Sequence, residues 1–268
     1  MKNEISPISE SNLSVAWAKA FLRVRKSPHQ QVHPLIVSVD WTTPALDLED
    51  MTIRSLLEAI LSKASKPTPA TVANTIFPQS LWNPKKPRAL LYKRYMEGAY
   101  PRLKHCFANN KGTYFQRMVS FDNSPREPVN QLEQVISTYL NGNHRHSALQ
   151  LSIFDPRKDH NNQPYLGFPC LHQVCLTPHG ANGADGLSIT GFYATQHLLP
   201  KAYGNYLGLF RLGQFMAHEM NLKFIGMTCI ASFTSVGADK DIKTGWVSKL
   251  EDDLQIYIEK KALKSGNK

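Results

Sequence analysis

The stretch Gly167-Phe168-Pro169-Cys170-Leu171-His172 ends a polar loop and begins a strand-like segment, and it is the most informative part of this 268-residue chain. Proline locks its own φ and holds the preceding residue extended, so Cys170 on this turn has a fixed direction. A cysteine there is a candidate nucleophile where nearby cations or hydrogen-bond donors lower its pKa. The sequence offers such neighbours at His144, Arg145, His146 and His172. A small core residue is the alternative role of a lone cysteine in an apolar stretch.

Downstream, Tyr203-Gly204-Asn205-Tyr206 opens a helix that is predicted to run to about Leu222. Its apolar residues fall on most faces of the helix, which predicts burial in the middle of the protein. Asn205 at the start of this helix can then present one amide to a ligand. His218 and Glu219, near its end, are more typical of surface or capping positions than of catalysts.

Other segments have clear local patterns. A polar stretch rich in turn-forming residues, from 155 to 164, predicts a surface loop that leads to the cysteine strand. The strongest remaining predictions are a helix over 13–22 capped by Ser11 or Asn12, a strand over 35–41, and a helix over 52–63 that begins at Asp50 or Thr52.

Length and composition agree with one globular α/β domain over residues 1–268. With 42% hydrophobic residues the chain can bury a full core. The basic residues from about 260 to 268 predict a disordered tail. Apolar runs stay short of the ~20 residues that span a bilayer, and the N-terminus does not resemble a signal peptide. We therefore expect a cytoplasmic protein without a membrane partner.

Metal and disulfide chemistry are not indicated. The four cysteines, at 106, 170, 175 and 229, have no CxxC spacing. Asp155 and Asp159 could be read as a metal pair, but aspartates in an Asp-Pro turn usually cap the backbone. No metal site is predicted.

The formal net charge of +10 is compatible with attraction to nucleic acid or to an anionic substrate, and also with solvated surface lysines. One basic patch combines Lys85-Lys86-Pro87-Arg88 with Lys93-Arg94. Three aromatic residues beside it could stack on bases, although their spacing is more typical of a helix face in the core: Trp82, Tyr92 and Tyr95.

From about Val129 to Ser232 the order of these parts resembles thymidylate synthases and the related pyrimidine hydroxymethylases. The matching segments follow the family's order: the helix from Val129 to Ile136, the strand from Leu149 to Asp155, the nucleophile turn Pro169-Cys170, the strand from Gly186 to Tyr193, and Asn205 at the start of the long helix. Two weaker matches lie upstream: the segment from Ile53 to Glu58 resembles the family's helix with a catalytic glutamate, and the segment from Gly112 to Arg117 resembles its Gly-x-x-Tyr segment.

The resemblance implies an α/β fold with a large mixed sheet flanked by helices and a long buried central helix. It implies that Cys170 adds to C6 of a pyrimidine and activates C5 for one-carbon transfer, with 5,10-methylenetetrahydrofolate as the implied donor and a sheet-to-sheet homodimer as the implied assembly. The roles it implies for other residues are the following: Glu58 and Tyr114 in catalysis, Asn205 in reading uracil, and Gln196, Tyr193, Arg145 and His172 in contacts with the substrate.

The chain also departs from the family. The position after the tyrosine strand, where the family keeps a phosphate-binding arginine, reads Ala194-Thr195-Gln196. The family also contributes a pair of arginines across its dimer, and in the corresponding part of this chain only Arg145 could serve. Leu171 follows Cys170, where the family usually has histidine. We therefore predict weak binding of free dUMP. Three functions stay open: pyrimidine C5 modification by Cys170, an inactive nucleotide-binding or partner-binding subunit, and modification of a pyrimidine held in a polymer.

Overall fold

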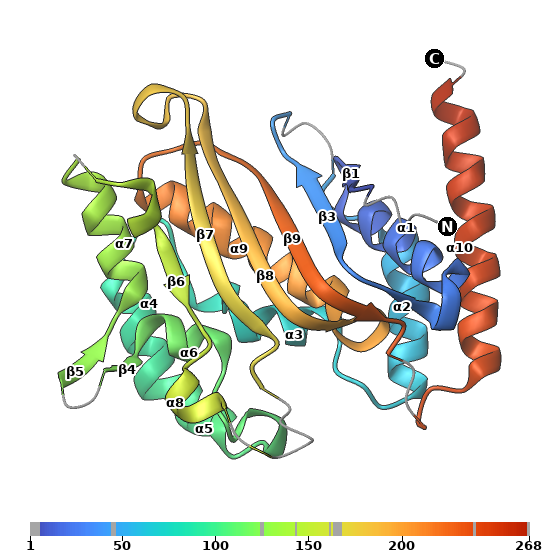
Figure 1. The fold of residues 1–268 in the computed structure, drawn as a ribbon, viewed down its shortest axis with the longest axis horizontal. Helices are drawn as coiled ribbons and strands as arrows, with labels where there is room; N and C mark the ends of the chain where they lie inside the picture. The colour runs from blue at the N-terminus through green and yellow to red at the C-terminus, as the bar shows by residue number, and fades with distance from the viewer. Residues whose placement is uncertain are drawn as a thin grey trace.

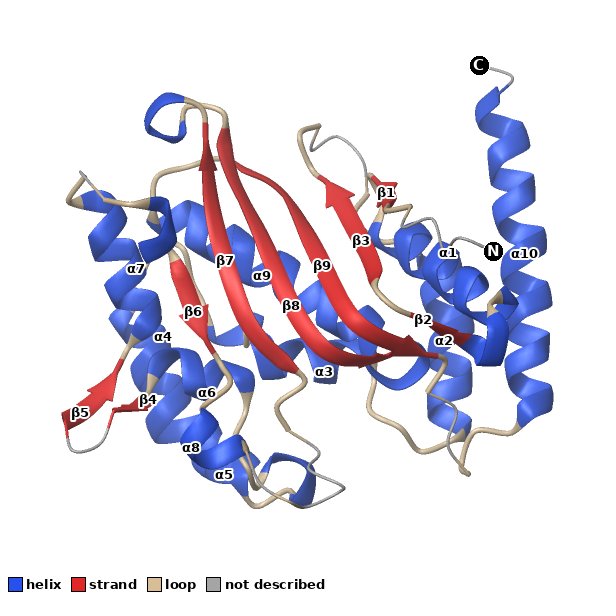
Figure 2. Ribbon diagram, viewed as in Figure 1, coloured by secondary structure: helices blue, strands red, loops and turns tan. Residues whose placement is uncertain are grey.

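A large mixed sheet forms the centre of the molecule in the computed structural model, which describes residues 6–43, 47–123, 126–142, 144–160, 162, 168–237 and 240–266 (Figures 1 and 2). Among these residues the sheet has seven strands, in the order β1-β3-β9-β8-β7-β6, with β2 also paired to β9. The strands are β1 (Ile8–Glu10), β2 (Gln31–Val32), β3 (Leu35–Asp40), β6 (Gln150–Ser152), β7 (Leu171–His179), β8 (Gly186–His197) and β9 (Phe224–Ser235). The pairs β1–β3 and β8–β9 are parallel and the others antiparallel.

A second, two-stranded sheet joins β4 (Phe121–Asn123) to β5 (Arg126–Val129). The α-helices are α1 (Leu13–Lys26), α2 (Met51–Lys63), α3 (Pro69–Ile76), α4 (Ala89–Lys93), α5 (Tyr100–Lys104), α6 (Tyr114–Val119), α7 (Gln131–Leu140), α8 (Pro156–Asp159), α9 (Tyr203–Glu219) and α10 (Thr244–Gly266). Shorter helical turns are η1 (Pro28–Gln30), η2 (Gln79–Leu81), η3 (Arg94–Ala99), η4 (Phe107–Asn109), η5 (His146–Ala148), η6 (Ala181–Gly183) and η7 (Leu198–Ala202).

The first elements begin where their capping residues are. The Asn12 side chain accepts a hydrogen bond from the backbone N–H of Val15, and Asp50 accepts two at the start of α2. In the same way Asn130 caps α7, so this helix begins at Gln131, and Val129 belongs to β5 instead. The predicted helices over 13–22 and 52–63 and the strand over 35–41 are confirmed.

Helix α9 is the central helix that the sequence predicts. It is buried along most of its length and packs between α3 and the sheet strands β8 and β9. Gly204 and Gly208 allow this packing, since a Cβ at Gly204 would lie 2.5 Å from the Cβ of Val72 on α3. The large mixed sheet with flanking helices confirms the predicted α/β class.

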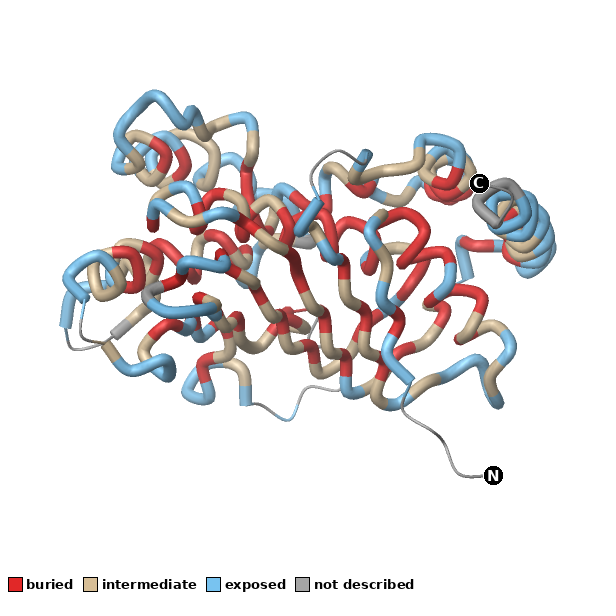
Figure 3. The backbone as a smooth tube through the Cα atoms, turned by 90° about the horizontal axis from the view of Figure 1, so that it is seen from above, coloured by how far each residue is buried: buried red, intermediate tan, exposed pale blue. Residues whose placement is uncertain are grey.

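The two faces of the sheet differ in their surroundings. Alternate residues are buried against α1 and α9, as at Leu35, Val37 and Val39 of β3, and Figure 3 shows buried and intermediate residues alternating along the central strands. On the opposite face, no helix of the described residues covers the central strands (Figures 1 and 2). This open face carries half-buried side chains, among them Ile36, Phe192 and Ile230.

Two stretches differ from the sequence-based expectation. The expected surface loop at 155–164 contains the helix α8, and Asp155 at its start is only 3% exposed because its carboxylate caps that helix and pairs with Arg157. Residues 161 and 163–167 lie outside the described residues. At the C-terminus, α10 includes residues 260–266, which the sequence assigns to a disordered tail. Lys261 on α10 forms an ion pair with Asp50 at 2.6 Å, and Tyr257 donates a hydrogen bond to the same carboxylate.

Candidate functional site

Cys170 lies at one end of β7, directly before its first residue. Its carbonyl accepts a hydrogen bond from the backbone N–H of Ala194 at 3.0 Å, and the next residue, Leu171, pairs with Tyr193. Because β7 and β8 are antiparallel, Cys170 lies beside the C-terminal part of β8. The chain then passes through η7 into α9, so the first turn of α9 begins at the same end of the sheet as Cys170.

Tyr114 reaches this position from a distant part of the chain. It is the first residue of α6, which Thr113 caps, and its hydroxyl oxygen accepts a hydrogen bond from the backbone N–H of Cys170 at 3.4 Å. Its ring packs against Phe168 with the ring centroids 5.1 Å apart. Burial raises the pKa of Tyr114 above its ordinary value, so this group is a neutral phenol near neutral pH. A neutral phenol beside a cysteine can donate or accept a hydrogen bond without adding charge.

Tyr193 lies on the buried face of the sheet at the same end. Its side chain is 2% exposed, and its hydroxyl is a buried polar atom without a hydrogen-bond partner among the described residues. Burial raises its pKa well above the ordinary value, and the neighbouring Cys229, Tyr114 and Cys170 act in the same direction. A buried hydroxyl without a partner costs free energy, so its presence needs an explanation beyond packing.

Asn205 is the third residue of α9 and is 4% exposed. Its carboxamide has no hydrogen bond to any described residue, although such a group has two donors and an acceptor. The turn that carries it is held in place by Tyr203, whose hydroxyl contacts Ser14 at 2.6 Å and donates to Glu49 at 2.9 Å. The position of Asn205 is therefore well supported, while its polar atoms are left available.

Gln196 is buried in the same region, but its carboxamide is already occupied. Its oxygen accepts a hydrogen bond from the Tyr206 hydroxyl at 2.9 Å, and its nitrogen donates to the sulfur of Cys229 at 3.4 Å. The side chain is 2% exposed. The structure therefore places this predicted substrate contact in a buried network that holds α9 against β8 and β9.

The electrostatics at Cys170 depend on burial and on Lys201. Burial raises the pKa of the Cys170 thiol, and the ammonium of Lys201 in η7 opposes that shift. The thiol is thus the dominant form near neutral pH in the free protein. Lys201 belongs to no sequence motif; its only sequence signal is its position in the short Leu-Leu-Pro-Lys-Ala turn between a strand and the long helix.

Glu58 lies on α2 and forms an ion pair with Arg54 at 3.0 Å, with 35% of its side chain exposed. Helix α2 packs against η7, so Glu58 is on an element next to the one that carries Lys201. Among the described residues no hydrogen bond joins Glu58 to Cys170 or Asn205. Its catalytic role stays a prediction.

His172 lies beside the Cys170 turn, where it forms a hydrogen bond with the backbone of Pro169, whereas Arg145 lies elsewhere. The ring of His172 packs against Phe154 at 4.8 Å, and burial lowers its pKa while Asp159 opposes the shift. Arg145 is exposed and precedes η5, and Leu149 after that turn accepts a hydrogen bond from Leu176. Arg145 is therefore near the end of β7 opposite to Cys170, together with its neighbours His144 and His146.

The remaining ionisable groups form ion pairs instead of a metal site. Arg117 binds the carboxylate of Asp159 and donates a hydrogen bond to the carbonyl of Ile153 at 2.8 Å. Within the described residues no group of three His, Cys, Asp or Glu side chains is arranged to hold a metal ion. The four cysteines are free thiols.

In the basic patch of the sequence, Arg88 is held by two hydrogen bonds to Glu133, each 2.7 Å long, and by Glu219 at 3.4 Å. Tyr95 beside it is fully buried, and Trp82 and Tyr92 pack against the core, as their spacing indicates. These aromatic rings are therefore core residues.

No protein-family model matches this chain, and no curated protein matches it. No helix among the described residues combines the length and apolar composition needed to cross a bilayer.

Proposed function

We propose that this protein binds a pyrimidine and that Cys170 adds to its C6 atom, as the resemblance to thymidylate synthases implies. The observation that carries the proposal is the hydrogen bond from Cys170 to Tyr114, which joins two of the residues named by the resemblance across 56 positions of sequence. Asn205 and Tyr193 lie at the same end of the sheet and have polar atoms without a hydrogen-bond partner among the described residues. Such atoms are expected where a ligand completes the hydrogen bonding.

The chemistry follows from the groups at this end of the sheet. The Cys170 thiolate forms a bond to C6, and the electron pair of the C5–C6 double bond moves to C5 and onto the O4 oxygen. Asn205 can donate to O4 and accept from N3–H, a pattern that suits uracil. Tyr114, a neutral phenol, can donate a hydrogen bond to the thiolate as it forms. Solvent can then protonate C5, and loss of the other C5 proton with release of Cys170 restores the ring.

The substrate is best described as a pyrimidine unit that does not depend on a buried monophosphate. A buried dianion needs several charge-assisted hydrogen bonds. Lys201 is the cation whose charge acts on Cys170 among the described residues, while Arg145 is at the other end of β7. A nucleoside, or a pyrimidine within a polymer, fits this charge balance better than free dUMP does.

The test is exchange of the uridine C5 hydrogen with deuterated water, followed by NMR. This exchange requires thiol addition but no one-carbon donor, so it probes Cys170 independently of the folate that the resemblance implies. We expect exchange with the wild-type protein and none with Cys170→Ser. The matched control is Cys175→Ser, which removes a half-buried thiol from β7, the strand that Cys170 precedes, and should retain exchange. Equal exchange in both variants would disprove the role of Cys170.

A second candidate is a pyrimidine-binding subunit without catalysis. The observation that favours it is the raised pKa of Cys170, because a buried thiol is a weak nucleophile. In that case uridine would raise the thermal unfolding temperature of the wild-type protein and of Cys170→Ser equally, and the C5 hydrogen would not exchange.

We further propose that the protein forms a homodimer through the open face of the sheet. Ile36, Ile230 and Phe192 occupy neighbouring positions on β3, β9 and β8, since Ile230 pairs with both of the others. This row gives the open face an apolar centre. In a two-fold arrangement with antiparallel strands, the Arg145 end of one chain would lie over the Cys170 end of its partner.

A further inference from the structure

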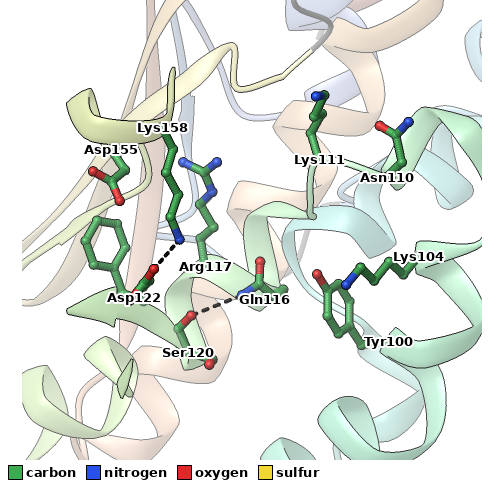
Figure 4. Close-up of a pocket in the computed structure, with 11 residues that line it drawn as sticks. Tyr100, Lys104, Asn110, Lys111, Gln116, Arg117, Ser120, Asp122, Asp155 and Lys158 are labelled. Atoms are coloured by element: carbon green, nitrogen blue, oxygen red, sulfur yellow. Dashed lines mark hydrogen bonds and ion pairs between the residues drawn. The ribbon is translucent and has the colours of Figure 1, made fainter. Parts of the chain in front are cut away.

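A polar pocket lies near the Cys170 turn and has no role in the proposed chemistry. Its volume is about 230 Å³, and its walls come from α5, α6, α8 and the start of β4. Figure 4 shows Lys104 and Lys111 on one side of this pocket, Asp122, Asp155 and Lys158 on the other, and Gln116 and Arg117 between them.

The pocket has an unbalanced positive charge. On its acidic side, Asp122 pairs with Lys158 at 2.5 Å and Asp155 pairs with Arg157. Arg117 pairs with Asp159. Lys104 and Lys111 have no ion pair or hydrogen bond with any described residue, and both are exposed. Two ammonium groups are thus left to attract an anion.

The uncharged side chains of the pocket are better suited to a phosphate group than to a partner rich in carboxylates. The side chain of Asn110 and the hydroxyl of Tyr100 provide hydrogen-bond donors beside the two lysines. Amide, hydroxyl and ammonium donors are the groups with which proteins bind phosphodiester oxygens.

An exposed aromatic residue lies in the segment between two residues of this pocket, Lys104 and Asn110. Phe107 in η4 is 88% exposed, and Lys104 and Lys111 flank it in the sequence. A phenylalanine this exposed gains nothing from the core. Bases of single-stranded nucleic acids stack on such rings, and cationic side chains around the ring bind the strand's phosphates.

The pocket is connected to the Cys170 turn through Phe168. The guanidinium of Arg117 lies 4.8 Å from the centre of the Phe168 ring, and the same ring packs against Tyr114, whose hydroxyl accepts a hydrogen bond from the backbone of Cys170. A ligand that reaches both Cys170 and the lysines therefore has to pass Phe168, as a strand of several nucleotides can.

We infer that the pocket with Lys104 and Lys111, together with Phe107, binds the sugar-phosphate backbone and a flanking base of single-stranded nucleic acid whose pyrimidine occupies the Cys170 site. This inference rests on the proposed function for the identity of the base at Cys170. The binding surface itself consists of residues that the proposed chemistry does not use.

The test is fluorescence anisotropy with a labelled deoxyuridine strand of about 12 nucleotides, within the ~4 to 16 that single-strand sites span. Removal of one phosphate contact should weaken binding about fivefold at ~0.1 M salt and lower the slope of log affinity against log salt by about 0.7. We therefore expect the double variant Lys104→Ala/Lys111→Ala to lose about 25-fold in affinity. Phe107→Ala should weaken binding without changing the salt slope.

The matched control is Lys249→Ala/Lys260→Ala, which removes the same charge from exposed positions on α10. Loss of affinity in both double variants would show that net charge alone attracts the strand and would overturn the inference. So would wild-type affinity in Lys104→Ala/Lys111→Ala. Binding of the protein to phosphatidylserine vesicles through Phe107, without binding to the strand, would overturn the inference in favour of a membrane surface.

Two readouts separate this inference from the proposed function. Cys170→Ser should bind the strand with wild-type affinity although it exchanges no C5 hydrogen. Conversely, Lys104→Ala/Lys111→Ala should still exchange the C5 hydrogen of free uridine. Absence of exchange in the wild-type protein would disprove the proposed chemistry, while the strand-binding measurements would still decide the role of the lysines.

Discussion

At the scale of single residues, the reactivity of Cys170 reflects a competition between burial and the charge of Lys201. We predict that alkylation by iodoacetamide, in a variant that keeps Cys170 as its only cysteine, has a pH midpoint above the usual thiol value of about 8.5. A positive charge stabilises the thiolate, so Lys201→Ala should move the midpoint to still higher pH, and Lys201→Arg should restore it. An unchanged midpoint in Lys201→Ala would show that the lysine does not act on the thiol.

The two buried amides near Cys170 should respond differently to substitution. Gln196→Ala removes the acceptor of the Tyr206 hydroxyl, and a buried hydroxyl without a partner costs about 1–3 kcal/mol. Asn205→Ala removes a carboxamide that has no partner among the described residues, so the free energy of unfolding should change by about 1 kcal/mol or less. Urea denaturation measures both values.

Uridine binding should be affected in the reverse order, more by Asn205→Ala than by Gln196→Ala. We expect Asn205→Ala to lose the thermal stabilisation by uridine, because the amide that reads O4 and N3–H is absent. Retention of uridine binding in Asn205→Ala, or a loss of stability as large as that of Gln196→Ala, would place Asn205 in the core network instead of the site.

At the scale of secondary-structure elements, the contact between α9 and α3 positions Asn205. A Cβ at Gly204 would lie 2.5 Å from the Val72 Cβ and 2.7 Å from the Pro69 carbonyl. We predict that Gly204→Ala destabilises the protein by about 1–3 kcal/mol, which is typical of an overpacked core. The control is Gly98→Ala in η3, where a Cβ meets nothing within 4 Å, so only the helix-forming advantage of alanine applies. Thermal unfolding of both variants tests this, and equal unfolding temperatures would contradict it.

The stabilisation that the contact between α2 and α10 gives the folded protein should depend on pH. Burial opposes ionisation of Asp50, but the hydrogen bonds and charge of Lys261 and Tyr257 outweigh it and lower the pKa. A carboxylate with a lowered pKa stabilises the folded state above its unfolded pKa of about 3.9, and this stabilisation disappears as the pH falls through the folded value. We predict that Asp50→Asn, which keeps a helix cap, destabilises the protein at neutral pH and much less in acid. An equal loss at both pH values would assign the effect to packing.

At the scale of the whole molecule, we expect the open sheet face to form the proposed dimer contact. We predict that sedimentation equilibrium gives a dimer and that Ile230→Lys, in the middle of the row Ile36-Ile230-Phe192, gives a folded monomer. In the dimer the lysine charge would be buried in an apolar contact, which strongly disfavours association. In the monomer the same position is half-exposed, so the charge stays in contact with water and folding is little affected. Ser248→Lys on the exposed side of α10 is the matched control and should stay dimeric. A monomeric wild-type protein would disprove the dimer.

The sequence by itself determined several elements and the class of fold. Helix periodicity, the candidate caps at Ser11 or Asn12 and at Asp50 or Thr52, and the short β-branched segment at 35–41 are local signals, so they were sufficient to predict α1, α2 and β3. The apolar content of the long helix likewise predicted the burial of α9. The α/β class followed from these elements.

Only the tertiary structure decided which polar groups are available to a ligand. Gln196 and Asn205 are both buried amides near the same turn of chain, yet one is occupied by Tyr206 and Cys229 and the other is not. Lys201 acts on Cys170, whereas Arg145 lies at the opposite end of β7. These differences depend on contacts between residues far apart in the chain, such as Tyr114 with Cys170, and sequence patterns report only the nearest neighbours along the chain.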